Sequence, residues 1–239
     1  GNVLWAKGEN FTPYSYSAAN GVISDDFGNV YVTGDFSANY FIIGNDTLDN
    51  VGNSGNTDIF LIKFDASGNL IWIKGAGSAG PDISSAICTD AAGNVFITGH
   101  YVTTINFGQL TIGPAAATNI YVVKYDSSGN ELWAQTASGS YYESSTGIAS
   151  DPQGYLYITG YYSSSFIVGS NVLNYAGGGS DLFIAKLGND AVSIDEKIDH
   201  NQINLYPNPS KGIFNFKDTK NIKQVEVYNL LGEQILAQG

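Results

Sequence analysis

A ten-residue stretch, DAAGNVFITG at 90–99, occurs three times with small changes in this chain of 239 residues. The other copies are DDFGNVYVTG at 25–34 and DPQGYLYITG at 151–160. Glycines and a lysine downstream of each copy keep the same register. A period of about sixty residues indicates a supersecondary unit repeated in tandem. Repetition therefore constrains the fold more than any other feature of the sequence.

Each unit has the pattern of four short strands. In the first unit they are expected at 21–25, 29–34, 58–64 and 69–74. An Asp-x-x-Gly-Asn turn joins the first two strands and again the last two, with Asp accepting backbone N–H bonds and Gly or Asn adopting a positive φ. Tyr, Phe, Val, Ile and Thr, which dominate the units, favour strands. We therefore predict an all-β fold of β-propeller blades, four-stranded sheets repeated around an axis.

The units extend over approximately 21–76, 83–136 and 146–188. The third unit lacks a fourth strand, whereas NVLWAK at 2–7 is an orphan last strand. Closed propellers typically have four to eight blades, so three blades predict a partial ring. We expect further blades upstream in the parent protein, and the alternative is an open arc that pairs with a second copy.

These units resemble the bacterial propeller repeats known as SBBP repeats. The core of that family is Asp-x-x-Gly-Asn-x-Tyr-x-Thr-Gly, and the three copies above keep its register. The resemblance covers residues 1 to about 188. It implies a blade architecture and names no ligand.

The sequence changes character after residue 188. A linker at 189–202 leads to INLYPNPSKGIFNF at 203–216 and QVEVYNLLGEQIL at 224–236. Residues 203–239 closely resemble the C-terminal sorting domain of the type IX secretion system, without the closing strands of that domain. The positions that match its motif are Tyr206, Pro207, Asn208, Pro209, Gly212, Val227, Tyr228, Asn229 and Gly232.

The sorting-domain resemblance implies an export route. A signal peptide in the parent protein would carry the chain across the inner membrane, and residues 203–239 would engage the type IX machinery at the outer membrane. The expected location is extracellular or at the outer cell surface.

Charge and hydropathy exclude several partners. The net charge is −12 and all ten basic residues are Lys, so the surface repels phosphate backbones and disfavours nucleic acid. It equally disfavours anionic membrane surfaces. No run of 18 or more apolar residues occurs, so no membrane span is expected. Cys88 is the single cysteine and is expected to be a small core residue.

Cofactor and metal motifs are not supported. GAGSAG at 75–80 matches Gly-x-Gly-x-x-Gly, but Pro81 follows and no helix comes next, so a dinucleotide site is not expected. GGGSD at 177–181 is a single copy of a calcium-type repeat that binds only in tandem. We predict no cofactor and no metal.

Catalytic residues are equally hard to assign. His100 occupies a position filled by Asp35 and Tyr161 in the sister units, so the scaffold does not require it. Glu131 and Glu143 are the acids that a glycosidase pair would use, although the sequence fixes no distance between them. We predict no catalytic residue.

Binding is expected on one face of the blades. Antiparallel strands place the short Asp turns on one face and the long links on the other, and function concentrates on long loops. Exposed tyrosines suit sugars or protein partners. Phe36, Tyr101 and Tyr162 are expected instead to pack between blades. The predicted binding residues are Tyr141, Tyr142, Tyr161, His100 and Asp35.

The sequence thus predicts a secreted or cell-surface, non-catalytic scaffold that binds polysaccharide or protein. One alternative is an extracellular propeller enzyme acting on polysaccharide, a lyase or a glycosidase. The other is a passive repeat spacer.

Overall fold

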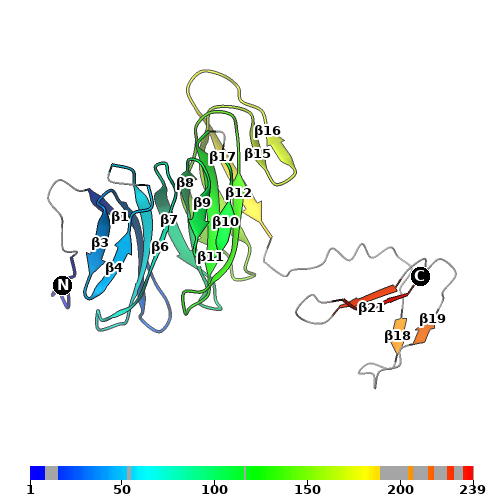
Figure 1. The fold of residues 1–239 in the computed structure, drawn as a ribbon, viewed down its shortest axis with the longest axis horizontal. Helices are drawn as coiled ribbons and strands as arrows, with labels where there is room; N and C mark the ends of the chain where they lie inside the picture. Colours follow the sequence, from blue (N-terminus) through cyan, green and yellow to red (C-terminus); the bar gives the residue numbers. More distant parts are fainter. Residues whose placement is uncertain are drawn as a thin grey trace. The chain divides into compact units, whose positions relative to one another are not determined.

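A computed structural model gives the fold of the chain (Figure 1). The contacts between residues divide the chain into two compact units, residues 1–190 and 191–239. Regular structure in the described residues consists entirely of β-strands, paired antiparallel, as predicted. The described residues are 1–8, 16–52, 55–115, 117–188 and four strands of the second unit, Asn204–Tyr206, Asn215–Lys217, Val225–Tyr228 and Gln234–Gln238.

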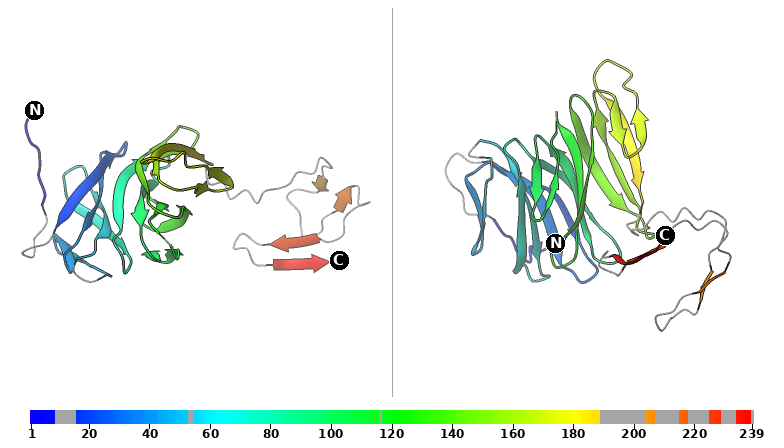
Figure 2. Two further views of the ribbon diagram at one scale, coloured as in Figure 1. Left: turned by 90° about the horizontal axis from the view of Figure 1, so that it is seen from above. Right: turned by 45° about the vertical axis from the view of Figure 1, so that its right-hand side comes forward.

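Three blade-like sheets make up the first unit, each pairing its strands in sequence order from the innermost outward. Viewed from above, they stand side by side in chain order (Figure 2). Contacts between β1 and β7 and between β7 and β13 join the inner strands of successive blades. Blade 1 comprises β1 (Ser17–Ser24), β2 (Val30–Phe36), β5 (Asp58–Phe64) and β6 (Leu70–Gly77); blade 2 comprises β7 (Ile83–Thr89), β8 (Val95–Tyr101), β11 (Asn119–Tyr125) and β12 (Glu131–Ala137); blade 3 comprises β13 (Glu143–Ser150), β14 (Leu156–Tyr162) and β17 (Asp181–Leu187).

The link between the second and third strand of each blade is more regular than expected from the sequence. It contains a hairpin whose turn holds a glycine at positive φ: Gly44, Gly108 or Gly169. The hairpin of blade 2 extends the sheet of blade 1, because β9 pairs with the end of β6. The hairpins are β3 (Tyr40–Ile43) with β4 (Asp46–Asp49), β9 (Ile105–Phe107) with β10 (Leu110–Ile112), and β15 (Phe166–Val168) with β16 (Asn171–Leu173).

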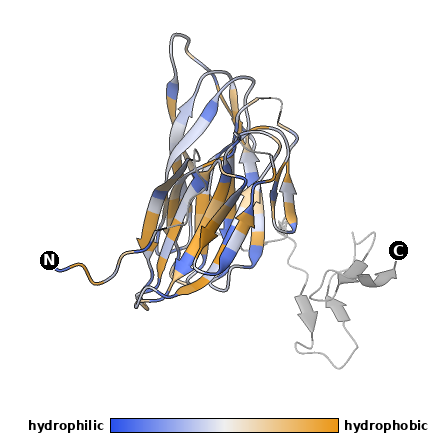
Figure 3. Ribbon diagram, turned by 60° about the vertical axis from the view of Figure 1, so that its left-hand side comes forward, coloured by the Kyte–Doolittle hydropathy of each residue, from blue (hydrophilic) through white to orange (hydrophobic). Residues whose placement is uncertain are grey.

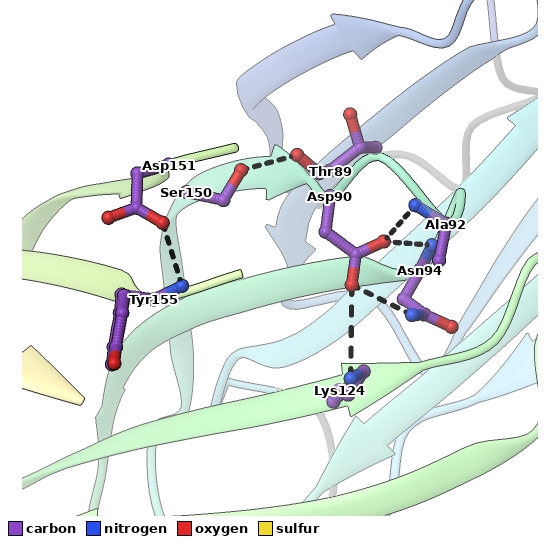
Figure 4. Close-up of polar contacts among 8 residues, drawn as sticks. All are labelled: Thr89, Asp90, Ala92, Asn94, Lys124, Ser150, Asp151 and Tyr155. Carbon is purple, nitrogen blue, oxygen red and sulfur yellow. Dashed lines mark hydrogen bonds and ion pairs between the residues drawn. The ribbon is translucent and has the colours of Figure 1, made fainter. Parts of the chain in front are cut away.

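The predicted Asp turns are formed, and Asp90 illustrates them (Figure 4). Its Oδ1 accepts from the backbone N–H of Ala92 at 3.0 Å and of Asn94 at 2.9 Å. Its Oδ2 accepts from Asn94 Nδ2 at 2.8 Å and lies 3.8 Å from Lys124 Nζ. Gly93 has φ 77°, the left-handed conformation that glycine adopts without strain. Five such turns, beginning at Asp25, Asp65, Asp90, Asp126 and Asp151, form what we call the turn face; the opposite end of the blades is the loop face.

A Thr-Gly pair ends each repeat, and in blades 1 and 2 its threonine contacts the next blade. Thr98 Oγ1 donates to Tyr121 O at 2.7 Å and lies 2.9 Å from Ser145 Oγ of blade 3. Gly99 has no side chain, and a Cβ there would overlap the carbonyl oxygen of Ile83 in the inner strand. The repeat therefore carries a glycine because two backbones approach closely at this point.

Apolar side chains fill the space between blades. One buried cluster lies between blades 1 and 2, and a second between blades 2 and 3. Hydrophobic segments accordingly follow the strands of the sheets (Figure 3). Tyr101 and Tyr162 pack between blades, as expected, and Cys88 is buried between blades 2 and 3. Phe36 is also buried, but it packs within blade 1 against Phe41 of the hairpin and not between blades.

The two ends of the first unit differ from a complete blade. Among the described residues, blade 3 has three strands. Residues 1–8 form no strand, contrary to the expectation for 2–7. The reason is physical: a strand needs a hydrogen-bonded neighbour, and no described strand pairs with this segment.

In the second unit, β18 (Asn204–Tyr206) pairs with β19 (Asn215–Lys217), and β20 (Val225–Tyr228) pairs with β21 (Gln234–Gln238). Of the predicted sorting motif, Tyr206 lies at the end of β18, and Val227 and Tyr228 lie in β20. The motif positions outside the described residues are Pro207, Asn208, Pro209, Gly212, Asn229 and Gly232.

Candidate functional site

Three of the predicted binding residues occupy equivalent positions at the loop face. Asp35 lies near the end of β2, His100 near the end of β8 and Tyr161 near the end of β14. Each pairs with the inner strand of its own blade, and Tyr161 is opposite Ser144. The blade geometry thus places one variable residue per blade at the same level.

His100 and two tyrosines form an aromatic cluster across blades 2 and 3. The rings of His100 and Tyr142 meet edge-on with centroids 5.7 Å apart, and those of Tyr142 and Tyr161 stack at 6.0 Å. His100 Nδ1 lies at hydrogen-bonding distance, 3.1 Å, from Ser144 Oγ. Tyr142 remains 40% exposed, so the cluster presents an aromatic surface to solvent. We call His100, Tyr142 and Tyr161 the aromatic cluster.

Two members of the aromatic cluster, His100 and Tyr142, are uncharged at neutral pH. Burial lowers the pKa of His100 to about 4, because an imidazolium there would lose its hydration. Burial, reinforced by the neighbouring Tyr161 hydroxyl, raises the pKa of Tyr142. A neutral aromatic surface suits ligands that offer C–H faces and hydroxyls.

Tyr141 borders the aromatic cluster through its sequence neighbour. Its side chain is 72% exposed, and its carbonyl accepts from the backbone N–H of Thr118 at 3.2 Å. The backbone around Tyr142 forms a bridge to the same residue, Thr118. The long link of blade 2 therefore fixes the segment while the Tyr141 ring projects into solvent.

A polar hollow of about 550 Å³ lies beside the cluster at the loop face. It extends from Asp35 in blade 1 to Ser144 in blade 3, the residue that His100 contacts. The inner strands carry a bulge at the same place in every blade, and a bulge redirects a side chain. The bulge residues, which also line the hollow, are Asn20, Ser85 and Thr146.

Asp35 is buried at the wall of this hollow. Its Oδ1 accepts from Asn20 Nδ2 at 2.5 Å, and the same amide donates to Ser84 O at 2.8 Å. Its Oδ2 is buried and has no hydrogen-bond partner among the residues that the structure describes. Burial raises the pKa of Asp35 to about 6. The structure thus separates Asp35 from the aromatic cluster: Asp35 lines the hollow, whereas the cluster borders it through the contact of His100 with Ser144.

Sequence reasoning missed two further buried acids, Asp58 and Asp82, which lie between blades 1 and 2. Asp58 Oδ2 accepts from the backbone N–H of Val51 at 2.6 Å. Burial raises the pKa of Asp58 to about 6 and that of Asp82, which also feels the Asp58 charge, to about 7. At the next boundary the equivalent positions are Asn119 and Glu143. The alignment of Asp58 with Asn119 was the signal in the sequence that could have revealed this position. The role of Asp58 is to anchor a loop.

A glycosidase pair of Glu131 and Glu143 is incompatible with the topology. Glu131 begins β12 at the turn face, where its carboxylate lies 3.9 Å from Lys74 Nζ. Glu143 begins β13 at the loop face and accepts from Ser164 Oγ at 2.7 Å. A seven-residue strand, roughly 20 Å long, separates the two faces, which exceeds the spacing that such a pair requires.

In the part of the chain that the structure describes, no group of three or more His, Cys, Asp or Glu side chains is placed to hold a metal ion. The same residues include no helix long and apolar enough to cross a membrane.

Comparison with known proteins identifies the tail. Residues 204–239 match the secretion system C-terminal sorting domain. This domain marks proteins that the type IX secretion system exports, so the chain is extracellular or on the outer cell surface. The match implies that the type IX machinery recognises this segment.

Two curated proteins are similar to the chain. Over 135 residues it is 27% identical to the uncharacterized WD repeat-containing protein L264 of Acanthamoeba polyphaga mimivirus, covering 51% of this chain and 10% of that protein. Over 167 residues it is 26% identical to the regulatory protein FlaEY of Caulobacter vibrioides, covering 68% of this chain and 17% of that protein. WD repeats build propeller blades, which agrees with the fold observed here. The chain spans only a small part of the length of either relative.

Proposed function

We propose that the exported chain is a non-catalytic scaffold that binds a neutral polysaccharide at the loop face. The observation that carries this proposal is that the aromatic cluster lies beside the polar hollow, because His100 contacts Ser144, which lines the hollow. Aromatic rings pack on the C–H faces of sugar rings, while hydroxyl, amide and carboxyl groups hydrogen-bond sugar hydroxyls.

Charge favours a neutral glycan. The chain carries a net charge of −12, and the carboxyl group of Asp35 is buried in the wall of the hollow. This charge would repel an anionic polysaccharide, whereas sugar hydroxyls would hydrogen-bond the hydroxyl and amide groups that line the hollow. Side chains such as Asn20 and Ser144 then orient the sugar hydroxyls, and the aromatic cluster is the surface that holds a ring.

The blades themselves we propose to be SBBP-type repeats. Support comes from the Asp-x-x-Gly-Asn turn and from the Thr-Gly pair, since the Asp, Asn, Thr and last Gly of that core each have a contact that explains them. The proposal concerns the repeat family and leaves the ligand assignment unaffected.

Binding to soluble polysaccharides tests the function. The full chain is run through native gels that contain neutral β-glucan, xylan or galactomannan, with pectin as the anionic comparison. We expect retardation by at least one neutral glycan and none by pectin. The double substitution Tyr142→Ala and Tyr161→Ala should abolish the retardation, because it removes both stacked rings.

Tyr40→Ala is the matched control. Tyr40 is 39% exposed, close to the 40% of Tyr142, but lies on the β3 hairpin of blade 1 outside the aromatic cluster. It should bind as the unsubstituted chain does. Retardation that survives the double substitution would defeat the proposed site. Failure of all the glycans, combined with capture of a cell-surface protein that requires Tyr142, would shift the function to protein binding.

A further inference from the structure

Several buried oxygen atoms lie together between blades 1 and 2 without hydrogen-bond partners. Asp82 is fully buried, and neither of its carboxyl oxygens has a partner among the residues that the structure describes. The same is true of Oδ1 of Asp58, which is 2% exposed, and of the buried hydroxyl oxygen of Thr57. Buried polar groups are nearly always hydrogen-bonded in native proteins, so this concentration of unsatisfied oxygens points to a bound ligand.

Backbone contacts bring the three residues together. The backbone N–H of Asp82 donates to the carbonyl of Thr57 at 2.8 Å, so the start of β7 lies beside the start of β5. The carboxyl group of Asp58 lies directly against Gly77, where a Cβ would overlap it. The carboxyl group of Asp82 lies near the next residue, Ser78. Both carboxyl groups therefore border the same short segment of the chain.

That segment belongs to GAGSAG at 75–80, the glycine-rich stretch that leads to no helix. It is tied to the link before β5, because Asn56 Nδ2 donates to Ala79 O at 2.9 Å. It is also tied to blade 2, because Ser78 Oγ donates to Val102 O at 2.8 Å. The stretch thus forms a fixed wall beside the two acids, and Gly77 leaves room for the Asp58 carboxyl group.

The two acids have little compensation for their charge. Among the described residues, neither Asp58 nor Asp82 forms an ion pair with a lysine. Donor groups of Ser78 and Val102 lie near enough to Asp82 to offset a part of its burial, but none of them forms a hydrogen bond with its carboxyl group. A water molecule would satisfy the oxygens and leave the charge, whereas a cation answers both.

The next boundary, between blades 2 and 3, carries a single acid at the equivalent positions. Asn119 stands in place of Asp58 and is uncharged. Glu143 stands in place of Asp82, and its Oε1 accepts from Ser164 Oγ at 2.7 Å. The packing of one blade on the next therefore does not require two acids, and the pair between blades 1 and 2 is a local feature.

We propose that Thr57, Asp58 and Asp82 bind a calcium ion between blades 1 and 2. Calcium takes about six to eight oxygen ligands in irregular geometry, so backbone carbonyls and water would complete the set. Magnesium fits less well, because it gives up its water reluctantly and these oxygens are shielded from solvent. The exported chain reaches the extracellular space, where protein modules bind calcium at about 0.1 to 1 mM. The proposal is independent of the polysaccharide function.

The polar hollow of the loop face gives the ion a route to the site. Thr57 and Ile83, which adjoin the two acids in the sequence, both line this hollow. A bound ion would join the start of β5 to the residue before β7, and so stabilise the boundary between blades 1 and 2. Calcium should therefore raise the stability of the first unit.

Thermal unfolding tests this expectation on the full chain. The protein is freed of divalent cations with EDTA, dialysed and heated at about pH 8 in about 0.15 M NaCl, which screens the acidic surface. Trp fluorescence reports the first unit, which contains all three Trp residues. We expect about 10 mM calcium to raise the midpoint by at least about 4 °C, and magnesium by less than half as much. An unchanged midpoint in calcium would refute the proposal.

Asp58→Asn removes one charge of the site and keeps the local fold, because asparagine occupies this place in blade 2 and still accepts from Val51. Without calcium it should unfold no earlier than the unsubstituted chain, and calcium should not shift its midpoint. Asp181→Asn is the matched control. Asp181 begins β17 as Asp58 begins β5, and it likewise accepts from a backbone N–H, that of Ala176 at 2.7 Å. This variant should retain the full calcium shift.

Equilibrium dialysis with radioactive calcium counts the bound ions. In the same buffer we expect one calcium per chain for the unsubstituted protein and for Asp181→Asn, and at least fivefold less for Asp58→Asn and for Asp82→Asn. Calcium bound equally by all four proteins would place the ion elsewhere on the acidic surface and overturn the site. Loss of binding in Asp181→Asn as well would overturn it too, because the effect would then follow net charge alone.

Discussion

The pKa values of carboxyl groups are shifted in opposite directions at the turn face and at the loop face of the blades. At the turn face, burial raises the pKa of Asp25 and Asp126, but hydrogen bonds from the turn outweigh it, so both lie below their usual value. At the loop face, burial dominates and raises the pKa of Asp35, Asp58 and Asp82. These turn-face acids are hydrogen-bonded anions, whereas these loop-face acids are buried and have few hydrogen-bond donors.

The difference shows which positions of the blades are structurally constrained and which are free to vary. The turn-face carboxylates accept hydrogen bonds from their own turns, so every blade can use the same four or five residues. The loop-face positions make contacts between blades, as His100 does with Ser144. Such contacts can differ from one blade to the next, and a binding site can develop there without disturbing the repeat.

Gly99→Ala should have the largest effect on stability. The glycine belongs to the repeat but lies at the loop end of β8, where a Cβ would overlap the backbone of Ile83. We expect a loss of at least about 3 kcal/mol in the free energy of unfolding, or failure to fold. Urea titration followed by Trp fluorescence measures it, because all three Trp residues lie in the first unit.

Gly179→Ala is the control for this substitution. A Cβ there would meet nothing within 4 Å. Its unfolding midpoint should match that of the unsubstituted chain. Equal stability of the Gly99 and Gly179 variants would show that close backbone approach does not explain the repeated glycine.

Asp90→Ala should come next, at about 2 kcal/mol. The change removes the acceptor of three hydrogen bonds and the partner of Lys124. Asp26→Ala is the matched control, because Asp26 is exposed in a sister turn and Ala91 occupies its place in the turn of Asp90. If Asp90→Ala and Asp26→Ala lost the same free energy of unfolding, the hydrogen bonds of Asp90 would not explain the loss. The comparison between the two faces would then fail.

Asp58→Asn should stabilise the chain, and only above acidic pH. The pKa of Asp58 is about 6 in the folded state against 3.8 ordinarily. Between these values the folded state retains a proton that the unfolded state has released, so stability falls as pH rises through this window. Asn copies Asn119 of blade 2, retains an acceptor for Val51 and avoids the buried charge.

We expect Asp58→Asn to add about 1 to 2 kcal/mol at pH 8 and close to nothing at pH 4. Asp49→Asn, at an exposed residue of β4, removes the same charge from the surface and should change neither value appreciably. A stabilisation that is equal at the two pH values would mean that ionisation of Asp58 is not its cause.

The features predicted from the sequence are those whose causes are local. The Asp90 turn depends on residues two and four positions away, so its geometry could be predicted from one copy and tested against the others. The hairpins were missed because strands of three residues around a single glycine, such as Gly108, look like an irregular loop. The Asn20 bulge was missed because nothing in the inner strand marks an extra residue.

The candidate site depends on contacts that no local pattern encodes. His100 and Tyr142 are 42 positions apart and meet only because blades 2 and 3 pack together. Periodicity placed Asp35, His100 and Tyr161 at one level correctly, since the register is common to the blades. It could not show that Asp35 would be buried in the wall of the hollow while the Tyr142 ring stays partly exposed to solvent.

Tyr141→Ser should have the smallest effect. The side chain is 72% exposed, and what holds this segment is the backbone hydrogen bond from Thr118, which serine retains. We expect a change below about 0.5 kcal/mol in the free energy of unfolding, measured in the same urea titration. A loss above 1 kcal/mol would place Tyr141 among the structural residues, and the loop face would then be less free to vary than its exposure indicates.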